Sequence, residues 1–412
     1  MTIIMPIAKI GRTAATFRQS LIQIEALAPR DEDFAGPELA SRDAESHQPA
    51  VTARCETSLD VQTALRAAGS HGLAVSVRSG ASRVGHELKP GELVVDLSAM
   101  RHVAVDPITR VAIVAGGATV NDVVIAAAER GLVPITGNSG TVSMVSLLSA
   151  GGYGPLLGRY GVAADNMLEA EIVLKNGQHV IANAKRSSAL FRALRNGRTD
   201  LGVVTSFQVQ LRALPSLLAG MIFYDLSEAD LVLRGYSAIA ASAPEDFTVA
   251  AGIAPAANGN PLVFIAPAWC GEIEKGARVL AALRSFGNPL AASVGPMDYA
   301  DLLAMYDRHL ARGSNYSIRR RWLGKLSERA ISAMIVAANA RTSPLSAVVL
   351  HHFHAAGNRM NSAPATFAAR NQHFMLEAIA SWEQTADDSG AGHRLWAENL
   401  SDGIVAGPVA SR

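Results

Sequence analysis

The stretch SAGGYGPLLGRYGVAADNMLEAEIVLKNGQ, residues 149–178, joins a glycine-rich turn to a β-hairpin. Residues 150–154 place three glycines in one turn, and Asn176 and Gly177 separate two strand-like apolar runs. Asn-Gly between such runs is the strongest short-range hairpin signal. Glycine permits turns that larger side chains forbid, and it lets main-chain N–H groups approach an anion or a flat ring closely. The stretch therefore indicates a β-rich domain whose turn suits such a ligand.

Three further clusters of glycine and serine lie in the same region, at residues 79–82, at Gly116 with Gly117, and at residues 137–140. One such cluster is more often a plain tight turn. Four in one domain favour a ligand cradle of main-chain N–H groups, to which Arg78 or Arg83 adds positive charge. Neither a Rossmann fingerprint nor a P-loop motif is present, so the cradle belongs to another fold.

Strands and helices alternate on both sides of these turns. TVNDVVIAAAERG, residues 119–131, predicts a helix with Thr119 or Asn121 as N-cap and Gly131 as its stop. Residues 13–30 space apolar side chains along one helical face, which predicts a helix there as well.

The pattern of apolar and polar residues changes after residue 212. Runs such as PLVFIAPAW (261–269) predict strands there, and runs such as SERAISAMIVAANAR (327–341) predict helices. We therefore expect an α+β fold with two domains, over residues 1–212 and 213–412, because a chain of 412 residues exceeds the usual single-domain length.

The composition is typical of a globular protein, with 49% hydrophobic residues, 18% charged residues and a formal net charge of +1. The balanced charge argues against nucleic acid as a partner. The N-terminal apolar run is too short for a signal core or a membrane-spanning helix, so no membrane partner is expected. Two cysteines, Cys55 and Cys270, favour a reducing compartment and a cytoplasmic protein, although one disulfide stays open.

Several stretches in fixed order carry a resemblance to a known family. They are VRSGASRVG, ELVVDLSAMRHVAVDP, AGGATVNDVVIAAAERGLVPITG, SAGGYGPLLGRYGVAADNMLEAEIVLKNGQ and LFRALRNGRTDLGVVTSF. Residues 51–211 thereby resemble the FAD-binding domain of the vanillyl-alcohol oxidase superfamily, in particular the berberine-bridge-enzyme-like oxidases. The resemblance implies a PCMH-type FAD-binding domain of two subdomains, followed by a substrate domain with an antiparallel sheet covered by helices.

The same resemblance implies which residues hold FAD, beginning with a turn that embraces the pyrophosphate. The implied cofactor-binding residues are Arg78, Ser79, Gly80, Ala81, Ser82, Arg83, Gly85, Ser139, Gly140, Thr141, Val142, Gly151, Gly152, Gly154, Asp165, Asn166, Gly202, Val203 and Val204.

This chain departs from the family at both positions that bond the flavin covalently. Ser82 stands where many members have a histidine, and Ser139 stands where others have a cysteine. The resemblance therefore implies FAD that is held non-covalently. Ser143, Ser146 and Ala150 also replace family glycines, and the family's C-terminal return segment has no counterpart before residue 412, so we expect a substrate domain without it.

Candidate catalytic residues lie in both halves of the chain. His351, His352 and His354 follow a strand-like run, and strand alternation puts His352 and His354 on one face and His351 with Phe353 on the other. We prefer His352 and His354 as the groups that accept a proton during hydride transfer, the alternative being buried, hydrogen-bonded histidines. Tyr153 is the third candidate, its alternative role being to fill the domain interface.

The sequence favours neither a metal site at the histidines nor a binding site at the arginine run. No metal site is expected, because no Cys or Glu pattern accompanies the histidines. The RRRW run at residues 319–322 is interpreted as a solvated face in preference to a site for an acidic substrate.

These features favour an FAD-dependent oxidoreductase that oxidises a C–OH or C–N bond of a small molecule, such as a sugar or a secondary metabolite. Hydride passes to the flavin, and dioxygen or another acceptor then reoxidises it. The altered flavin positions leave a second class open, a protein of the flavin fold without redox activity that acts as a cyclase or a small-molecule binding protein.

Overall fold

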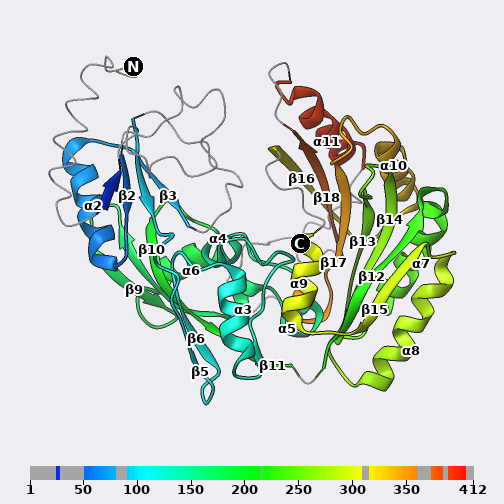
Figure 1. Cartoon of the computed structure of the whole chain (residues 1–412), viewed down its shortest axis with the longest axis horizontal. Helices are drawn as coiled ribbons and strands as arrows, with labels where there is room; N and C mark the ends of the chain where they lie inside the picture. The colour runs from blue at the N-terminus through cyan, green and yellow to red at the C-terminus, as the bar shows by residue number, and fades with distance from the viewer. Residues whose placement is uncertain are drawn as a thin grey trace. The chain divides into compact units, whose positions relative to one another are not determined.

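The computed structural model describes residues 25–27, 51–79, 91–214, 216–308, 315–359, 373–383 and 388–404. Contacts divide the chain into two compact units (Figure 1). Unit 1 comprises residues 1–134, 140–152 and 163–212, and unit 2 comprises residues 135–139, 153–162 and 213–412. The sequence-based division at residue 212 thus misplaces two short segments, 135–139 and 153–162, because they pack with unit 2.

Unit 1 contains a four-stranded sheet in the order β1-β2-β4-β3. Its strands are β1 (Glu25–Leu27), β2 (Val51–Arg54), β3 (Val75–Arg78) and β4 (Leu93–Asp96). β4 is parallel to β2 and β3, and β1 is antiparallel to β2. The helix expected over residues 13–30 is wrong at β1, because pairing with β2 outweighs the local apolar spacing. The rest of that helix lies outside the described residues.

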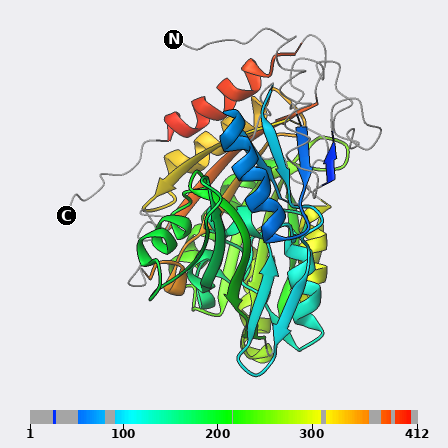
Figure 2. The same cartoon turned by 90° about the vertical axis from the view of Figure 1, so that its left-hand side faces the viewer.

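Helix α2 (Ser58–His71) packs against this sheet. A capping box between Thr57 and Asp60 starts the helix, and Gly72 ends it in the left-handed conformation, at φ 65°. Its apolar face joins a core that includes Val95 of β4. Figure 2 shows α2 in blue beside the strands of unit 1.

A five-stranded antiparallel sheet, in the order β5-β6-β10-β8-β9, forms the second part of unit 1. Its strands are β5 (Val103–Asp106), β6 (Val111–Ala115), β8 (Met167–Leu174), β9 (His179–Asn183) and β10 (Gly202–Gln210). The predicted hairpin is confirmed, since Gly177 turns β8 into β9 at φ 78°. The remaining elements of unit 1 are α3 (Val120–Ala128), α4 (Met144–Ser149), α6 (Ser188–Arg195), η2 (Ala163–Asn166) and β7 (Leu132–Val133). Strand β11 (Arg212–Ala213) lies at the end of this unit.

Helix α3 confirms the helix predicted from residues 119–131. Thr119, one of the two N-cap candidates, accepts a hydrogen bond from the Asp122 N–H, and the Asp122 carboxylate accepts one from Thr119 in return. This capping box fixes where the helix begins, because both otherwise orphaned backbone donors are satisfied.

Unit 2 is built on a seven-stranded antiparallel sheet in the order β15-β12-β14-β13-β17-β18-β16. Its strands are β12 (Leu218–Asp225), β13 (Phe247–Pro255), β14 (Pro261–Trp269), β15 (Ala291–Pro296), β16 (Asn315–Leu323), β17 (Ala347–His352) and β18 (Phe374–Trp382). Its helices are α5 (Leu157–Tyr160), α7 (Ala229–Ala241), α8 (Ile273–Leu283), α9 (Tyr299–Asp307), α10 (Glu328–Asn339) and α11 (Ala391–Gly403), with short turns η3 (Leu226–Glu228), η4 (Arg284–Phe286) and η5 (Ala355–Gly357).

The two faces of this sheet differ in what they contact. Leu376 and Ala378 of β18 belong to a core shared with helix residues such as Val232 of α7 and Met334 of α10. Because successive strand residues point to opposite faces, Glu377 lies on the face away from these helices. The fold is α+β, and its helix-covered antiparallel sheet is the one expected for the second domain.

The described residues were also compared with three features considered in the sequence, namely a disulfide, a membrane-spanning helix and a metal site. Cys55 and Cys270 are both free and buried, so the disulfide left open is not formed. Within the described ranges, no helix combines the length and apolar character needed to cross a membrane. The same ranges hold no cluster of three or more His, Cys, Asp or Glu side chains suited to a metal ion.

Candidate active site

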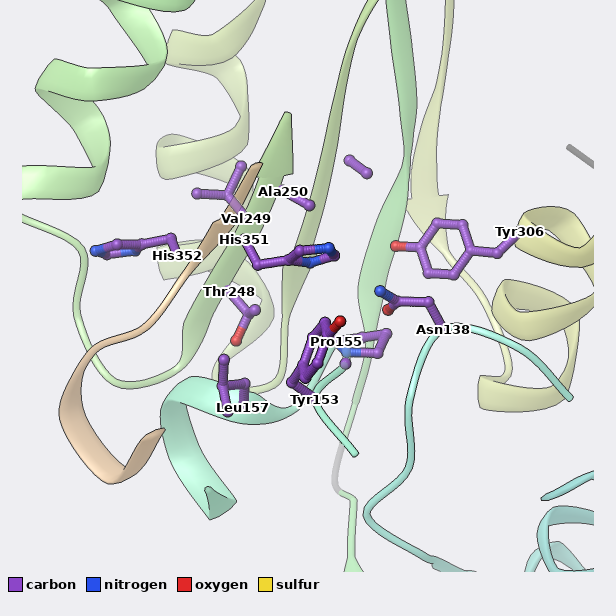
Figure 3. Close-up of a pocket in the computed structure, with 12 residues that line it drawn as sticks. Asn138, Tyr153, Pro155, Leu157, Thr248, Val249, Ala250, Tyr306, His351 and His352 are labelled. Carbon is purple, nitrogen blue, oxygen red and sulfur yellow. The ribbon is translucent and has the colours of Figure 1, made fainter. Parts of the chain in front are cut away.

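A pocket opens in unit 2 on the sheet face that carries Glu377. Its empty volume is about 310 Å³, counting space open to solvent. It is lined by Asn138, Tyr153, Gly154, Pro155, Leu157, Thr248, Val249, Ala250, Ala266, Tyr306, His351 and His352. Figure 3 shows the His351 ring directed toward Tyr153 and Tyr306, with His352 directed away from them.

Beside this pocket, Glu377 of β18 receives three hydrogen bonds through a side chain that is only 9% exposed. The Tyr153 hydroxyl donates to Oε1 at 2.6 Å, and the Arg320 Nε–H donates to the same oxygen at 2.8 Å. His351 Nε2 lies 3.1 Å from Oε2. An ionised carboxylate only accepts, so Nε2 of His351 carries a proton. Residues from four chain segments thus form one polar cluster.

Burial alone would raise the pKa of Glu377, but the hydrogen bond and charge of His351, together with the charge of Arg320, lower it to about 2. Burial and the neighbouring charge of Glu377 raise the pKa of Tyr153 well above its usual value of 10. At neutral pH the cluster therefore pairs an ionised carboxylate with a protonated phenol. This pair can accept a proton through the tyrosine oxygen.

The position of Tyr153 depends on the glycine that follows it. A Cβ atom on Gly154 would lie 2.5 Å from the Thr136 carbonyl oxygen and 2.8 Å from that of Gly137. Only glycine allows the two backbones to approach so closely. The Tyr153 ring is then held edge-on to His351, at 4.7 Å between ring centroids.

His352 and His354, the preferred histidines, lie on the helix side of the sheet. Their rings stack at 4.4 Å and 5°, and His352 contacts Phe374 of the helix-side core. Burial lowers the pKa of His352 to about 3 and also lowers the pKa of His354. The alternation predicted from the sequence is observed, but it is His351 that reaches the polar cluster.

On the cofactor side, two segments far apart in sequence meet within unit 1. The Ser79 and Ser143 hydroxyls lie 2.8 Å apart, which joins the end of β3 to the loop before α4. Ser143 also caps α4 by accepting from the Ser146 N–H, so this departure from the family glycine has a local structural role. Arg78 pairs with Asp96 of β4 at 2.6 Å, and its side chain stays 40% exposed.

At three of the described glycines among the implied FAD contacts, an added Cβ would collide with neighbouring protein atoms. A Cβ on Gly140 would meet the Asn121 side chain at 2.0 Å, and one on Gly202 would meet the Val173 carbonyl at 2.2 Å. Gly152 combines φ +66° with a Cβ position 2.7 Å from the Ala163 side chain. The packing of the protein itself therefore accounts for glycine at these positions, independently of any ligand that the turns bind.

Three other implied contacts already have protein partners. Asp165 pairs with Arg195 at 3.0 Å, both nearly buried. Asn166 accepts from Arg212 at 2.7 Å. Ser139, which belongs to unit 2, donates to Asp307 at 2.5 Å.

The remaining implied contacts lie in loops, at a strand end or outside the described ranges. Thr141 and Val142 lie in the loop before α4, and the Val142 carbonyl accepts from Val120. Gly151 has φ 92°, and its carbonyl accepts from Ala164. The positions that fall outside the described residues are Gly80, Ala81, Ser82, Arg83 and Gly85.

The described part of unit 1 fits an FAD cradle. Ser79 and Ser143 bring the predicted pyrophosphate turn to the predicted flavin loop. At the other end, Gly202, Val203 and Val204 of β10 pair with β8, while the pairing of β10 with β6 starts only at Ser206. Backbone groups at a strand end with one partner strand suit the polar edge of a ring.

Sequence reasoning missed Glu377 and Arg320. The signal for Glu377 was one carboxylate inside the apolar run FMLEAIASW, since a charged residue there is almost never buried without partners. The arginine run was interpreted as a solvated face, but Arg320 binds Glu377, Arg319 pairs with Glu398 and Arg321 pairs with Asp402.

Comparisons with known proteins agree with this geometry. A family model described as an FAD binding domain matches residues 49–183. The (R)-6-hydroxynicotine oxidase of Paenarthrobacter nicotinovorans is 31% identical over 290 residues, which are 69% of this chain and 63% of that protein. The chain thus spans less than two thirds of the length of that relative.

Solved structures share the fold of this chain. A crystal structure of 6-hydroxy-D-nicotine oxidase from Arthrobacter nicotinovorans superposes with a TM-score of 0.80 at 26% identity, covering 93% of this chain and 85% of that one. BBE-like 28 from Arabidopsis thaliana shares the fold, with a TM-score of 0.80 at 20% identity over 94% of this chain and 84% of that one. Residues 49–183 thus match an FAD binding domain, and the chain is similar to oxidases of the PCMH-type fold.

Proposed function

We propose that this chain is an FAD-dependent oxidoreductase that oxidises a C–OH or C–N bond of a small molecule, with its flavin held non-covalently. The observation that carries the proposal is the hydrogen bond of 2.6 Å from the Tyr153 hydroxyl to the buried Glu377 carboxylate beside the pocket. Oxidation of an alcohol or amine requires a group that accepts the proton, and this pair is such a group.

In the proposed reaction, the substrate O–H or N–H donates to the Tyr153 oxygen. As the substrate loses its proton to that oxygen, the Tyr153 proton moves to Glu377, whose pKa of about 2 keeps it ionised beforehand. Arg320 and His351 hold the carboxylate in place through their own hydrogen bonds. Bound FAD would supply the hydride acceptor for the substrate carbon, with dioxygen or another acceptor as the final oxidant.

Unit 1 would hold FAD through Arg78 and Ser79 at the end of β3, the loop of residues 140–142, and the start of β10. Non-covalent attachment is supported by serine at both linkage positions, because Ser82 and Ser139 have neither a ring nitrogen nor a thiolate to bond the flavin ring. The Ser139 hydroxyl is in addition bonded to Asp307.

The first test is the visible spectrum of the purified protein with added FAD, before and after acid precipitation. A yellow protein whose colour passes wholly to the supernatant supports non-covalent flavin, whereas colour that stays in the pellet contradicts it. Anaerobic mixing with panels of alcohols and amines should then bleach the flavin, and oxygen uptake should follow on exposure to air. Flavin that dithionite reduces but no candidate substrate bleaches would favour a binding protein or a cyclase instead.

A further inference from the structure

Tyr153, the proposed proton acceptor, belongs to a short excursion of the chain. Residues 153–162 pack with unit 2, whereas the residues on both sides of them pack with unit 1. Within unit 1, the Gly152 carbonyl accepts a hydrogen bond from the Ala163 N–H at 2.7 Å, so the two ends of the excursion lie together. Compact loops with close ends are held by their own packing. The position of Tyr153 in unit 2 therefore depends on the contacts of residues 153–162.

Helix α5, a single turn, follows Tyr153 closely. Only residues 154–156 separate the two, and the Leu157 N–H donates to the Gly154 carbonyl across this link at 3.1 Å. Within the link, the ring of Pro155 restricts its own φ. Because the link is short, closed by a hydrogen bond and restricted in its torsions, a displacement of α5 would also displace Tyr153.

Helix α5 rests on unit 2 through Gly158. Its N–H donates to the Thr248 hydroxyl of β13 at 3.0 Å, in a buried hydrogen bond. A Cβ atom on Gly158 would lie 2.7 Å from the Glu245 carbonyl oxygen and 2.7 Å from Nε2 of His354. A larger residue would therefore displace α5 or its neighbours. His354, preferred from the sequence as a catalytic group, is thus part of the surface on which α5 packs.

Arg159, the next residue, fastens the same helical turn through its side chain. Its Nη1 donates to Oδ1 of Asp246 at 2.8 Å and to the Cys270 carbonyl oxygen at 2.6 Å. Asp246 precedes β13, Cys270 follows β14, and the Cys270 N–H donates to the Asp246 carbonyl at 2.9 Å. The guanidinium thus binds the ends of two paired strands at once. Charge-assisted hydrogen bonds are stronger than neutral ones, so Arg159 adds to the anchor that Gly158 provides.

We propose that Arg159 is a positioning residue for Tyr153, because it fixes α5 to the ends of β13 and β14 and thereby holds the Tyr153 hydroxyl at hydrogen-bond distance from Glu377. The inference rests on the proposed function, in which that hydrogen bond carries the proton. Arg159 is not among the residues that line the pocket, so it acts through α5 and not on the substrate. Loosening α5 would misplace the hydroxyl, and reactions slow steeply when their groups are misplaced.

The first measurement follows the Tyr153 hydrogen bond without any substrate. The chain has 7 tyrosines, so isotopic labelling at tyrosine Cζ gives a simple NMR spectrum, in which Tyr153→Phe identifies the Tyr153 signal. Glu377→Gln gives the position of that signal when the bond to the carboxylate is lost. We expect Arg159→Met to move the signal toward this position. Arg159→Lys, which keeps a charged donor, should restore it in part.

Two further variants separate positioning from a general loss of stability. Arg234→Met removes another partly exposed arginine of unit 2, which binds carboxylates of α7 and α10, and it should leave the Tyr153 signal unchanged. Gly158→Ala keeps Arg159 but pushes α5 away from the sheet, and it should move the signal in the same direction as Arg159→Met. The Arg159 side chain is 34% exposed, so methionine there leaves no buried cavity and the variant should fold.

The second measurement is anaerobic flavin bleaching, with the alcohol or amine of the panel that bleaches the wild-type flavin as the probe. We expect Arg159→Met to lower the maximal rate of flavin reduction by about tenfold to a hundredfold. The half-saturating probe concentration and the dissociation constant of FAD should stay unchanged. Arg159→Lys should recover part of the rate, whereas a residue that only stabilises the fold would not separate these quantities.

An unshifted Tyr153 signal in Arg159→Met, or an equal shift in Arg234→Met, would overturn the inference. A weaker affinity for FAD, or a changed half-saturating concentration at an unchanged maximal rate, would also overturn it and would assign Arg159 to binding. The proposed function fails separately if the signal shifts as expected but no member of the panel bleaches the wild-type flavin. The inference fails alone if the probe bleaches the flavin of Arg159→Met as fast as that of the wild type.

Discussion

The carboxylate of Glu377 lies inside an otherwise apolar strand, where an unpaired charge would be strongly destabilising. Tyr153, Arg320 and His351 supply the donors that keep it ionised. Arg320 stays about half exposed, so the cluster connects a buried carboxylate with the protein surface. In the proposed reaction, Tyr153 is therefore the residue that contacts the substrate, and Glu377 is the separate group that finally receives the proton.

Replacing Tyr153 by Phe removes the hydroxyl that transfers the proton and keeps the ring contact with His351. We expect the rate of flavin reduction by substrate to fall by about a hundredfold to a thousandfold, because a positioned acid–base group contributes that much. Glu377→Gln should lower the rate similarly. The measurement is anaerobic stopped-flow reduction, with dithionite reduction as the control for an intact flavin site. An unchanged rate in Tyr153→Phe would remove this residue from the proton path.

At the scale of elements, the hairpin between β8 and β9 depends on one backbone conformation. Gly177 has φ +78°, and a Cβ there would lie 2.4 Å from the Arg66 side chain of α2. Arg66 also donates to the Gly177 carbonyl at 3.2 Å, which fastens the turn to α2. The turn thus serves both the hairpin and the contact between the sheet and the helix.

The variant Gly177→Ala should lower the free energy of unfolding by about 1 kcal/mol or more, from left-handed strain and displacement of Arg66. Gly69→Ala is the matched control. Gly69 lies within α2, with nothing within 4 Å of an added Cβ, so alanine there should stabilise by about 0.5–1 kcal/mol. Chemical denaturation followed by circular dichroism measures both. The same sign for both variants would contradict the argument from backbone conformation.

At the scale of the whole molecule, acid stability depends on buried groups of unit 2 whose charge states burial controls. His352 is neutral when folded, with its pKa lowered to about 3 by burial and by the nearby His354 and His373. In the unfolded chain its pKa returns to about 6.5. The folded state therefore binds fewer protons than the unfolded state between these two values, and this stability is present above pH 6.5 and lost as the pH falls toward 3.

We expect the free energy of unfolding to fall by about 2 kcal/mol from pH 7 to pH 5 on account of His352. His354 changes it in the same direction, because its pKa is also lowered. Glu377, with its pKa lowered from 4.5 to about 2, adds a further loss only below about pH 4.5. Denaturant titrations at each pH measure the slope, which should be shallower in His352→Gln. An identical slope in that variant would show that other groups control acid stability.

Local signals were sufficient for a large part of the fold. The Asn176-Gly177 hairpin and the helix that starts at Thr119 depend on backbone preferences and caps over a few residues, and both are confirmed. The glycine-rich turns, in their order along the chain, also predicted the FAD binding domain that a family model matches over residues 49–183. The exception is β1, where an apolar spacing typical of a helix is overridden by pairing with β2.

The sequence by itself determined the α+β class, the hairpin, the helix caps and the order of the cofactor turns, because each depends on neighbours in the chain. Tertiary structure decided the rest. Strand register placed His351 and Glu377 on one face of the sheet and His352 on the other, and the return of residues 135–139 and 153–162 to unit 2 brought Asn138 and Tyr153 to the pocket. The contact between Tyr153 and Glu377 joins residues 224 positions apart, and no local preference encodes it.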